Sequence, residues 1–157
     1  MFTTILVGTD GSVGATKAVQ EAAELAAVCP GATLHIVTVQ KPMAATAVAS
    51  AELATATPAG AEIEWESETR ERLEQLLAGV AEQVAASGTA VETHARFGGP
   101  AEVLCDMALH LGADLIVVGN RGMKGGRRFL GSVPNTVSHH APCSVLIVDT
   151  SDDDSTS

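Results

Sequence analysis

Residues 115–118 are Leu-Ile-Val-Val and residues 145–148 are Val-Leu-Ile-Val, two apolar runs without a polar residue. A strand with one face in solvent would alternate apolar and polar side chains instead. Continuous runs of this kind are typical of parallel strands that helices cover on both faces. Each run therefore predicts a buried strand in a sheet of the α/β class.

The rest of the chain alternates between short β-rich runs and amphipathic helical stretches. Strands are expected at residues 5–7, 33–39, 91–97, 114–118 and 145–148, and helices at 13–28, 61–87, from Pro100 to Gly112 and at about 133–140. Ser12 is the expected N-cap of the first helix, and Gly88 and Gly112 are expected to end later ones. The alternation predicts an α/β, doubly wound parallel sheet of five strands with helices on both faces.

Composition limits the classes of function. The chain has 157 residues, which suits one domain, and 46% hydrophobic residues, which suffice for a core. The net charge of −10 disfavours nucleic acid and anionic lipid as partners. Three widely spaced Cys residues suit a reduced, cytoplasmic protein, and we expect neither a signal peptide nor a membrane span.

Two segments are expected to lie outside the packed domain, which we place at residues 1–149. Residues 41–60 contain eight Ala and two Pro, which indicates a long mobile loop. Residues 150–157 are acidic and polar, which indicates a disordered tail.

The segment most informative about function spans residues 119–133. It holds five of the 15 glycines and four of the nine basic residues, Arg121, Lys124, Arg127 and Arg128, and no acid. The rest of the chain, with five bases and 19 acids, carries a net charge of −14. Ligands of open α/β sheets bind at the carboxyl ends of strands, where this segment begins. Glycine amides and the helix start after Gly131-Ser132 suit a phosphate.

Each of these features also has an explanation that involves no ligand. The glycine segment is neither a Walker A loop nor a dinucleotide fingerprint, and a solvated loop would have a similar composition. Asp10, which follows the first strand, suits either a ligand hydroxyl or a turn. His35 is expected to be a core histidine, and the adjacent His139 and His140 do not form a metal pair. No metal site or catalytic constellation is evident.

Several motifs together resemble the universal stress protein family over nearly the whole chain. They are Ile-Leu-Val-Gly-Thr-Asp-Gly-Ser at 5–12, Leu-His-Ile-Val at 34–37, Ala-Asp-Leu-Ile-Val-Val-Gly-Asn-Arg-Gly at 113–122, Leu-Gly-Ser-Val-Pro at 130–134 and Pro-Cys-Ser-Val-Leu-Ile-Val at 142–148. The ATP-binding members carry Gly-x2-Gly-x9-Gly-Ser/Thr. This chain has Gly119-x2-Gly122 and Gly131-Ser132. Eight residues separate Gly122 from Gly131, in place of the nine in the family signature.

The resemblance implies a five-stranded sheet of order 3-2-1-4-5 and a set of nucleotide-binding residues. Asp10 would bind the ribose hydroxyls with Thr9 beside the base, and Ile36 would contact adenine. The remaining residues that it implies would contact ribose and phosphates: Gly119, Arg121, Gly122, Gly131, Ser132 and Val133. Arg127 and Arg128 of the basic segment would act through the phosphate charge.

The resemblance also implies a function in the stress response. The expected ligand is ATP, with or without Mg²⁺; AMP or cyclic AMP is one alternative, and a dimeric interaction protein without nucleotide is another. At most slow ATP hydrolysis is expected. An enzyme of the related adenine-nucleotide α-hydrolase group ranks last, because its Ser-Gly-Gly-x-Asp-Ser loop is missing. We expect a homodimer through the last strand, with Val145 and Ile147 taking part.

Overall fold

A computed structural model describes residues 1–42, 59–120 and 132–150 of the chain. The strands are β1 (Thr4–Gly8), β2 (Thr33–Gln40), β3 (Ala90–Phe97), β4 (Leu115–Gly119) and β5 (Ser144–Val148). The α-helices are α1 (Val13–Ala27), α3 (Ala59–Val84), α4 (Pro100–Leu111) and α5 (Val133–His140), and a short 3-10 helix (Ala85–Ser87) follows α3.

All neighbouring strands of the sheet are parallel, in the order β3-β2-β1-β4-β5. This confirms the predicted fold class and strand order. Strand β1 lies in the middle, with Leu6 opposite His35 of β2 on one side and Ile116 of β4 on the other. Strands β3 and β5 form the two edges.

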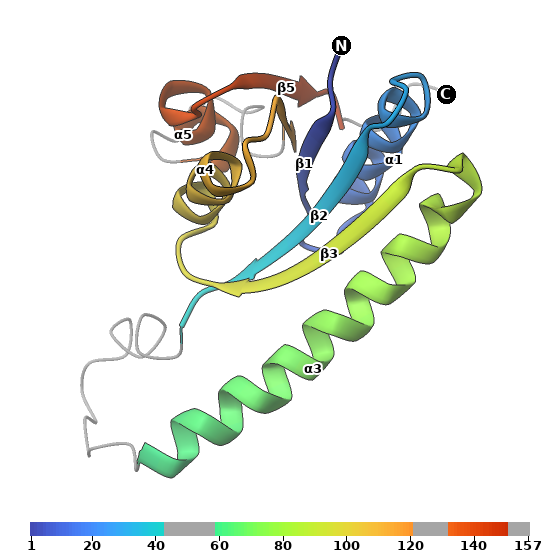
Figure 1. The fold of residues 1–157 in the computed structure, drawn as a ribbon. Helices are drawn as coiled ribbons and strands as arrows, with labels where there is room; N and C mark the ends of the chain where they lie inside the picture. Colours follow the sequence, from blue (N-terminus) through green and yellow to red (C-terminus); the bar gives the residue numbers. More distant parts are fainter. Residues whose placement is uncertain (43–58, 121–131, 151–157) are drawn as a thin grey trace, which may run out of the picture.

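Helices cover both faces of the sheet (Figure 1). Helices α1 and α3 lie on one face and bury a core that includes Ala18, Ala22 and Ala23 of α1, Leu77 of α3, and Ile5, Val7, Leu34 and Ile36 of the sheet. Helices α4 and α5 lie on the other face, where their side chains Leu104 and Val137 pack over Leu6, Val37, Ile116 and Val118. Successive residues of β1 thus enter opposite cores, which is why its apolar run is uninterrupted.

The predicted capping residues are confirmed. The Ser12 hydroxyl accepts a hydrogen bond from the amide of Ala15 at 3.3 Å and caps α1. Gly112 ends α4 with φ +64°, and Gly88 follows the 3-10 helix with φ +70°. Both values lie in the left-handed region, which glycine enters without the cost of a Cβ.

The boundaries of the two outlying segments differ from expectation where the structure describes them. Ala59 and Gly60 belong to α3 and not to the loop predicted over 41–60. Thr150, assigned to the tail, is placed beside the sheet. The rest of the predicted loop at 43–58 and of the tail at 151–157 lies outside the described residues.

No helix among the described residues has an apolar stretch long enough to cross a membrane.

We predict that α3 contributes to stability through its buried stripe. Leu77 is 2% exposed in the core under α1 and α3, so Leu77→Ala should lower the free energy of unfolding by about 2–5 kcal/mol. Leu109→Ala, at a position 72% exposed on α4, is the matched control and should change it by less than about 0.5 kcal/mol. Urea denaturation measures both, and equal effects would contradict the assignment of Leu77 to the core.

Candidate functional site

A cavity of about 400 Å³ opens at the carboxyl ends of β1 and β4. These two strands are neighbours from which the chain leaves toward opposite faces of the sheet, the place where doubly wound folds bind ligands. Its described lining comes from strand ends, helix starts and one residue after β5: Gly8, Thr9, Asp10, Ser12, Gly14, Ala15, Val37, Val39, Pro100, Leu104, Val118, Gly119, Ser132, Val133, Pro134 and Thr150.

The turn after β1 places Thr9 and Asp10 at the cavity. The Thr9 amide donates to the Val37 carbonyl at 2.8 Å, and the Thr9 hydroxyl accepts from the Gly11 amide at 3.2 Å. Asp10 Oδ1 accepts from the Ser12 amide at 2.9 Å, so the carboxylate helps to form the turn. Asp10 is nevertheless exposed and lines the cavity. The turn holds its side chain at the cavity without burying it.

Three helices begin at the cavity. Ser12 and Ala15 from the start of α1, Pro100 from α4 and Ser132 and Val133 from α5 all line it. The first amides of a helix have no partner inside the helix, and the helix dipole makes this end positive. Within the described residues the Ser132 hydroxyl makes no capping hydrogen bond. The arrangement favours an anionic group near the start of α5.

An apolar wall forms another side of the cavity. It consists of Val37 and Val39 from β2, Leu104 from α4 and Val118 from β4. A flat apolar ring would find hydrophobic contacts there, while the strand ends supply polar groups.

Ile36, expected to contact adenine, does not line the cavity. It is fully buried in the core on the opposite face of the sheet, beside Ile5 and Val7. Side chains alternate along a strand, so Val37 and Val39 point to the cavity side and Ile36 cannot. The sequence predicts a strand here, but not which of its two faces lies toward the cavity.

Thr150 is a cavity residue that the sequence placed in the tail. Asn120 holds it, because the Asn120 Oδ1 accepts from the Thr150 amide at 3.0 Å and from its hydroxyl at 2.9 Å. A Cβ at Gly119 would lie 2.9 Å from the Thr150 methyl group, and one at Gly14 would lie 3.2 Å from its Cβ. The two glycines therefore let Thr150 lie against the ends of β4 and α1.

The structure thus brings together five of the residues predicted from the sequence: Thr9, Asp10, Gly119, Ser132 and Val133. Ile36 is buried elsewhere, and the other five lie outside the described residues: Arg121, Gly122, Arg127, Arg128 and Gly131. The chain leaves the described part after Asn120 and re-enters it at Ser132. Ser132 lines the cavity, and so does Gly119, which directly precedes Asn120.

Comparisons with known proteins agree with this fold. The model of the universal stress protein family matches residues 1–149. A universal stress protein of Synechocystis sp. is 44% identical over 86 residues, which are 54% of this chain and 53% of that protein. The chain spans about half the length of the curated relatives it matches.

Solved structures match over almost the whole chain. A universal stress protein in complex with cAMP is 31% identical, with a TM-score of 0.74, and the match covers 96% of this chain and 99% of that one. A universal stress protein from Lactobacillus plantarum is 28% identical, with a TM-score of 0.72, over 93% and 97% of the two chains. With its strand order, its cavity and the matched family model, the chain belongs to the universal stress protein family.

Proposed function

We propose that the chain binds ATP or a related adenine nucleotide in the cavity at the ends of β1 and β4. The observation that carries the proposal is that Asp10 and the start of α5 line the same cavity, with an apolar wall beside them. A nucleotide carries an apolar base, a diol and an anion, and this lining offers a complementary group to each.

Each part of the ligand has a proposed contact. The base would lie against Val37 and Val39, and the ribose hydroxyls would donate to the Asp10 carboxylate. The phosphates would lie near Ser132 and Val133, where α5 begins. The glycines and arginines of 119–131 would complete this end, because they supply close backbone amides and positive charge.

The other contacts of the proposal follow the family resemblance. They are Gly119, Arg121, Gly122 and Gly131. Arg127 and Arg128 are added for their positive charge. A Mg²⁺ ion would accompany ATP only through its phosphates.

Binding, rather than catalysis, is the function we propose. Asp10 is the one carboxylate among the described residues that line the cavity, and its Oδ1 accepts from the Ser12 amide in the turn. Hydrolysis of ATP would be slow at most, since activation of water calls for a general base near the γ-phosphate.

Cyclic AMP is the second candidate, because a solved relative of 31% identity is a complex with cAMP. The two ligands differ at the ribose. In cyclic AMP the 3′ oxygen is esterified, so only one hydroxyl remains to donate. Asp10 therefore distinguishes the two candidates chemically.

We predict that Asp10→Ala weakens ATP binding about 10- to 150-fold. This range corresponds to the loss of one charge-assisted hydrogen bond, about 1.5–3 kcal/mol. The substitution should hardly change the affinity for 2′,3′-dideoxy-ATP, which has no ribose hydroxyl to donate. It should weaken the binding of cyclic AMP less than that of ATP. Isothermal titration of the wild type and the variant with the three nucleotides measures these differences.

Glu24→Ala is the control for the change in net charge, because Glu24 is exposed on α1 and does not line the cavity. It should leave all three affinities unchanged. Equal losses for ATP and its dideoxy analogue in Asp10→Ala would show that Asp10 serves the turn alone. No binding of any of the three by the wild type would favour an interaction protein without nucleotide.

We also propose a homodimer formed through β5. This strand pairs with β4 on one side and is an edge of the described sheet. Val145 and Ile147 are half-buried and pack toward the core under α4 and α5, whereas the Leu146 side chain is 39% exposed. An apolar edge strand pairs readily with a second strand, so the backbone and Leu146 would make the contact.

Sedimentation at micromolar concentration should show a dimer, and Leu146→Lys should shift it toward monomer. A lysine on an edge strand disfavours pairing because its charge would have to be buried. Leu109→Lys places the same charge on an exposed leucine of α4 and should leave the dimer intact. A monomeric wild type, or equal shifts in both variants, would reject the proposed interface.

A further inference from the structure

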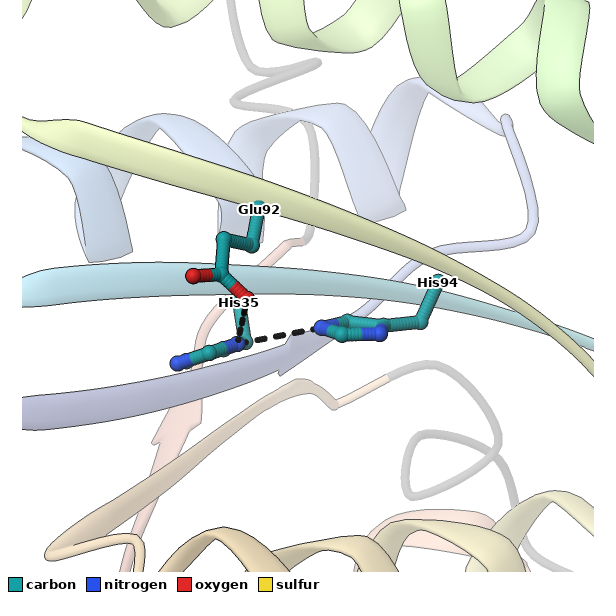
Figure 2. Close-up of side chains that lie close together, drawn as sticks. All are labelled: His35, Glu92 and His94. Carbon is teal, nitrogen blue, oxygen red and sulfur yellow. Dashed lines mark hydrogen bonds and ion pairs between the residues drawn. The ribbon is translucent and has the colours of Figure 1, made fainter.

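Three metal-ligating side chains meet between β2 and β3, away from the nucleotide cavity. His35 lies directly opposite Glu92 in the parallel register, and His94 follows Glu92 by two residues. Since side chains alternate along strands, all three lie on the same face of the sheet. Figure 2 shows the three side chains converging there.

The donor atoms are spaced as a small metal ion requires. His35 Nδ1 lies 3.0 Å from His94 Nε2 and 3.5 Å from Glu92 Oε2, and one donor atom from each residue lies within 4.8 Å of the others. Tetrahedral zinc with bonds of 2.0–2.1 Å to nitrogen places neighbouring donors about 3.3 Å apart. Small side-chain adjustments would therefore bring the three atoms around one ion.

The two imidazoles face each other nitrogen to nitrogen. Without an ion, one of these nitrogens carries the hydrogen and donates a hydrogen bond to the other, which accepts it with its lone pair. With an ion between them, both lone pairs would serve as ligands, and the Glu92 carboxylate would supply negative charge. His and Glu in a two-to-one ratio are a common ligand set of zinc sites that keep one position open.

Neutral imidazole is the form of histidine that binds metal. The His35 side chain is 8% exposed, between the strands, whereas Glu92 is 61% exposed, so an ion can enter from solvent. Burial first, then His35 and Arg96, lower the pKa of His94 below its ordinary value, while Glu92 raises it.

Helix α4 supplies the other charged groups near this face. His94 and Arg96 line a second cavity, of about 390 Å³, together with Asp106 and His110 of α4. The Arg96 guanidinium opposes a cation, but one of its nitrogens donates to the Ala95 carbonyl at 2.9 Å. Asp106 supplies a compensating negative charge on the facing helix.

We infer that His35, Glu92 and His94 form a binding site for a divalent transition-metal ion of the Zn²⁺ type. The ligand atoms are His35 Nδ1, His94 Nε2 and a carboxylate oxygen of Glu92. Solvent fills the remaining position. The ion ties the edge strand β3 to β2, and its binding does not require a nucleotide.

The test is isothermal titration of the intact chain with ZnCl₂, without nucleotide. One ion should bind per chain. His94→Gln and Glu92→Gln should each weaken this binding at least about tenfold, since even outer-shell partners of metal ligands are worth 10- to 100-fold. Co²⁺ should give visible absorption bands in the wild type that both variants lose.

Two controls separate this site from other ligands on the chain. His139→Gln removes an exposed histidine of α5 and should leave the affinity unchanged. Cys105→Ser tests the thiols, because sulfur also binds zinc; burial raises the pKa of the Cys105 thiol and disfavours the thiolate. This variant should likewise bind as the wild type does.

Folding is checked by circular dichroism in the absence of metal. Glu92 is largely exposed, so Glu92→Gln is expected to fold even where His94→Gln does not, and it then decides the question alone. Zn²⁺ should raise the melting temperature of the wild type more than that of the variant. Absence of saturable binding at one ion per chain, or an unchanged affinity in folded Glu92→Gln, would overturn the proposal.

Discussion

The burial of β1 between β2 and β4 is the constraint on which the rest of the structure depends. Ile5, Leu6 and Val7 are completely buried, and the strand is hydrogen-bonded on both sides. A strand in this position needs helices on both faces of the sheet. The chain accordingly leaves β1 toward one face and β4 toward the other. The ends of β1 and β4 are then left uncovered by crossing helices, and the cavity forms there.

One face of β2 serves both proposed sites. His35, Val37 and Val39 alternate along this strand and lie on the side of α4. Val37 and Val39 line the cavity at the ends of β1 and β4, and His35 belongs to the cluster with Glu92 and His94. Helix α4 spans the same two regions. Its start lines the cavity at the ends of β1 and β4, and its last two turns line the second cavity beside His94 and Arg96.

The sequence predicted the elements because strands, caps and glycines act locally. The apolar run of β4, the cap at Ser12 and the stop at Gly112 each depend on a few neighbouring residues. Asp10 and Ser132 could be placed at the cavity because strand ends and helix starts meet at one edge of a parallel sheet.

The features that the sequence could not predict depend on long-range contacts. Which face of β2 lies toward the cavity, that of Ile36 or that of Val37, is set by what packs on each face. Thr150 is held by Asn120, 30 residues earlier. The histidine cluster requires the register of β2 and β3, and His35 and His94 are 59 residues apart. Glu92 and His94 lie two residues apart on β3, but His35 comes from another strand, so the spacing in the sequence could not reveal the full set.

We propose that a nucleotide binds in the cavity where β1 and β4 end. An NMR titration of the isotopically labelled chain with ATP tests it most directly, because amide shifts report where the ligand lies. We expect saturable changes in the amide chemical shifts of Gly8, Thr9 and Asp10 and of the first residues of α5. The amide shift of His94 should change little. Saturation with shifts confined to other parts of the sheet, or no shifts at millimolar ATP, would contradict it.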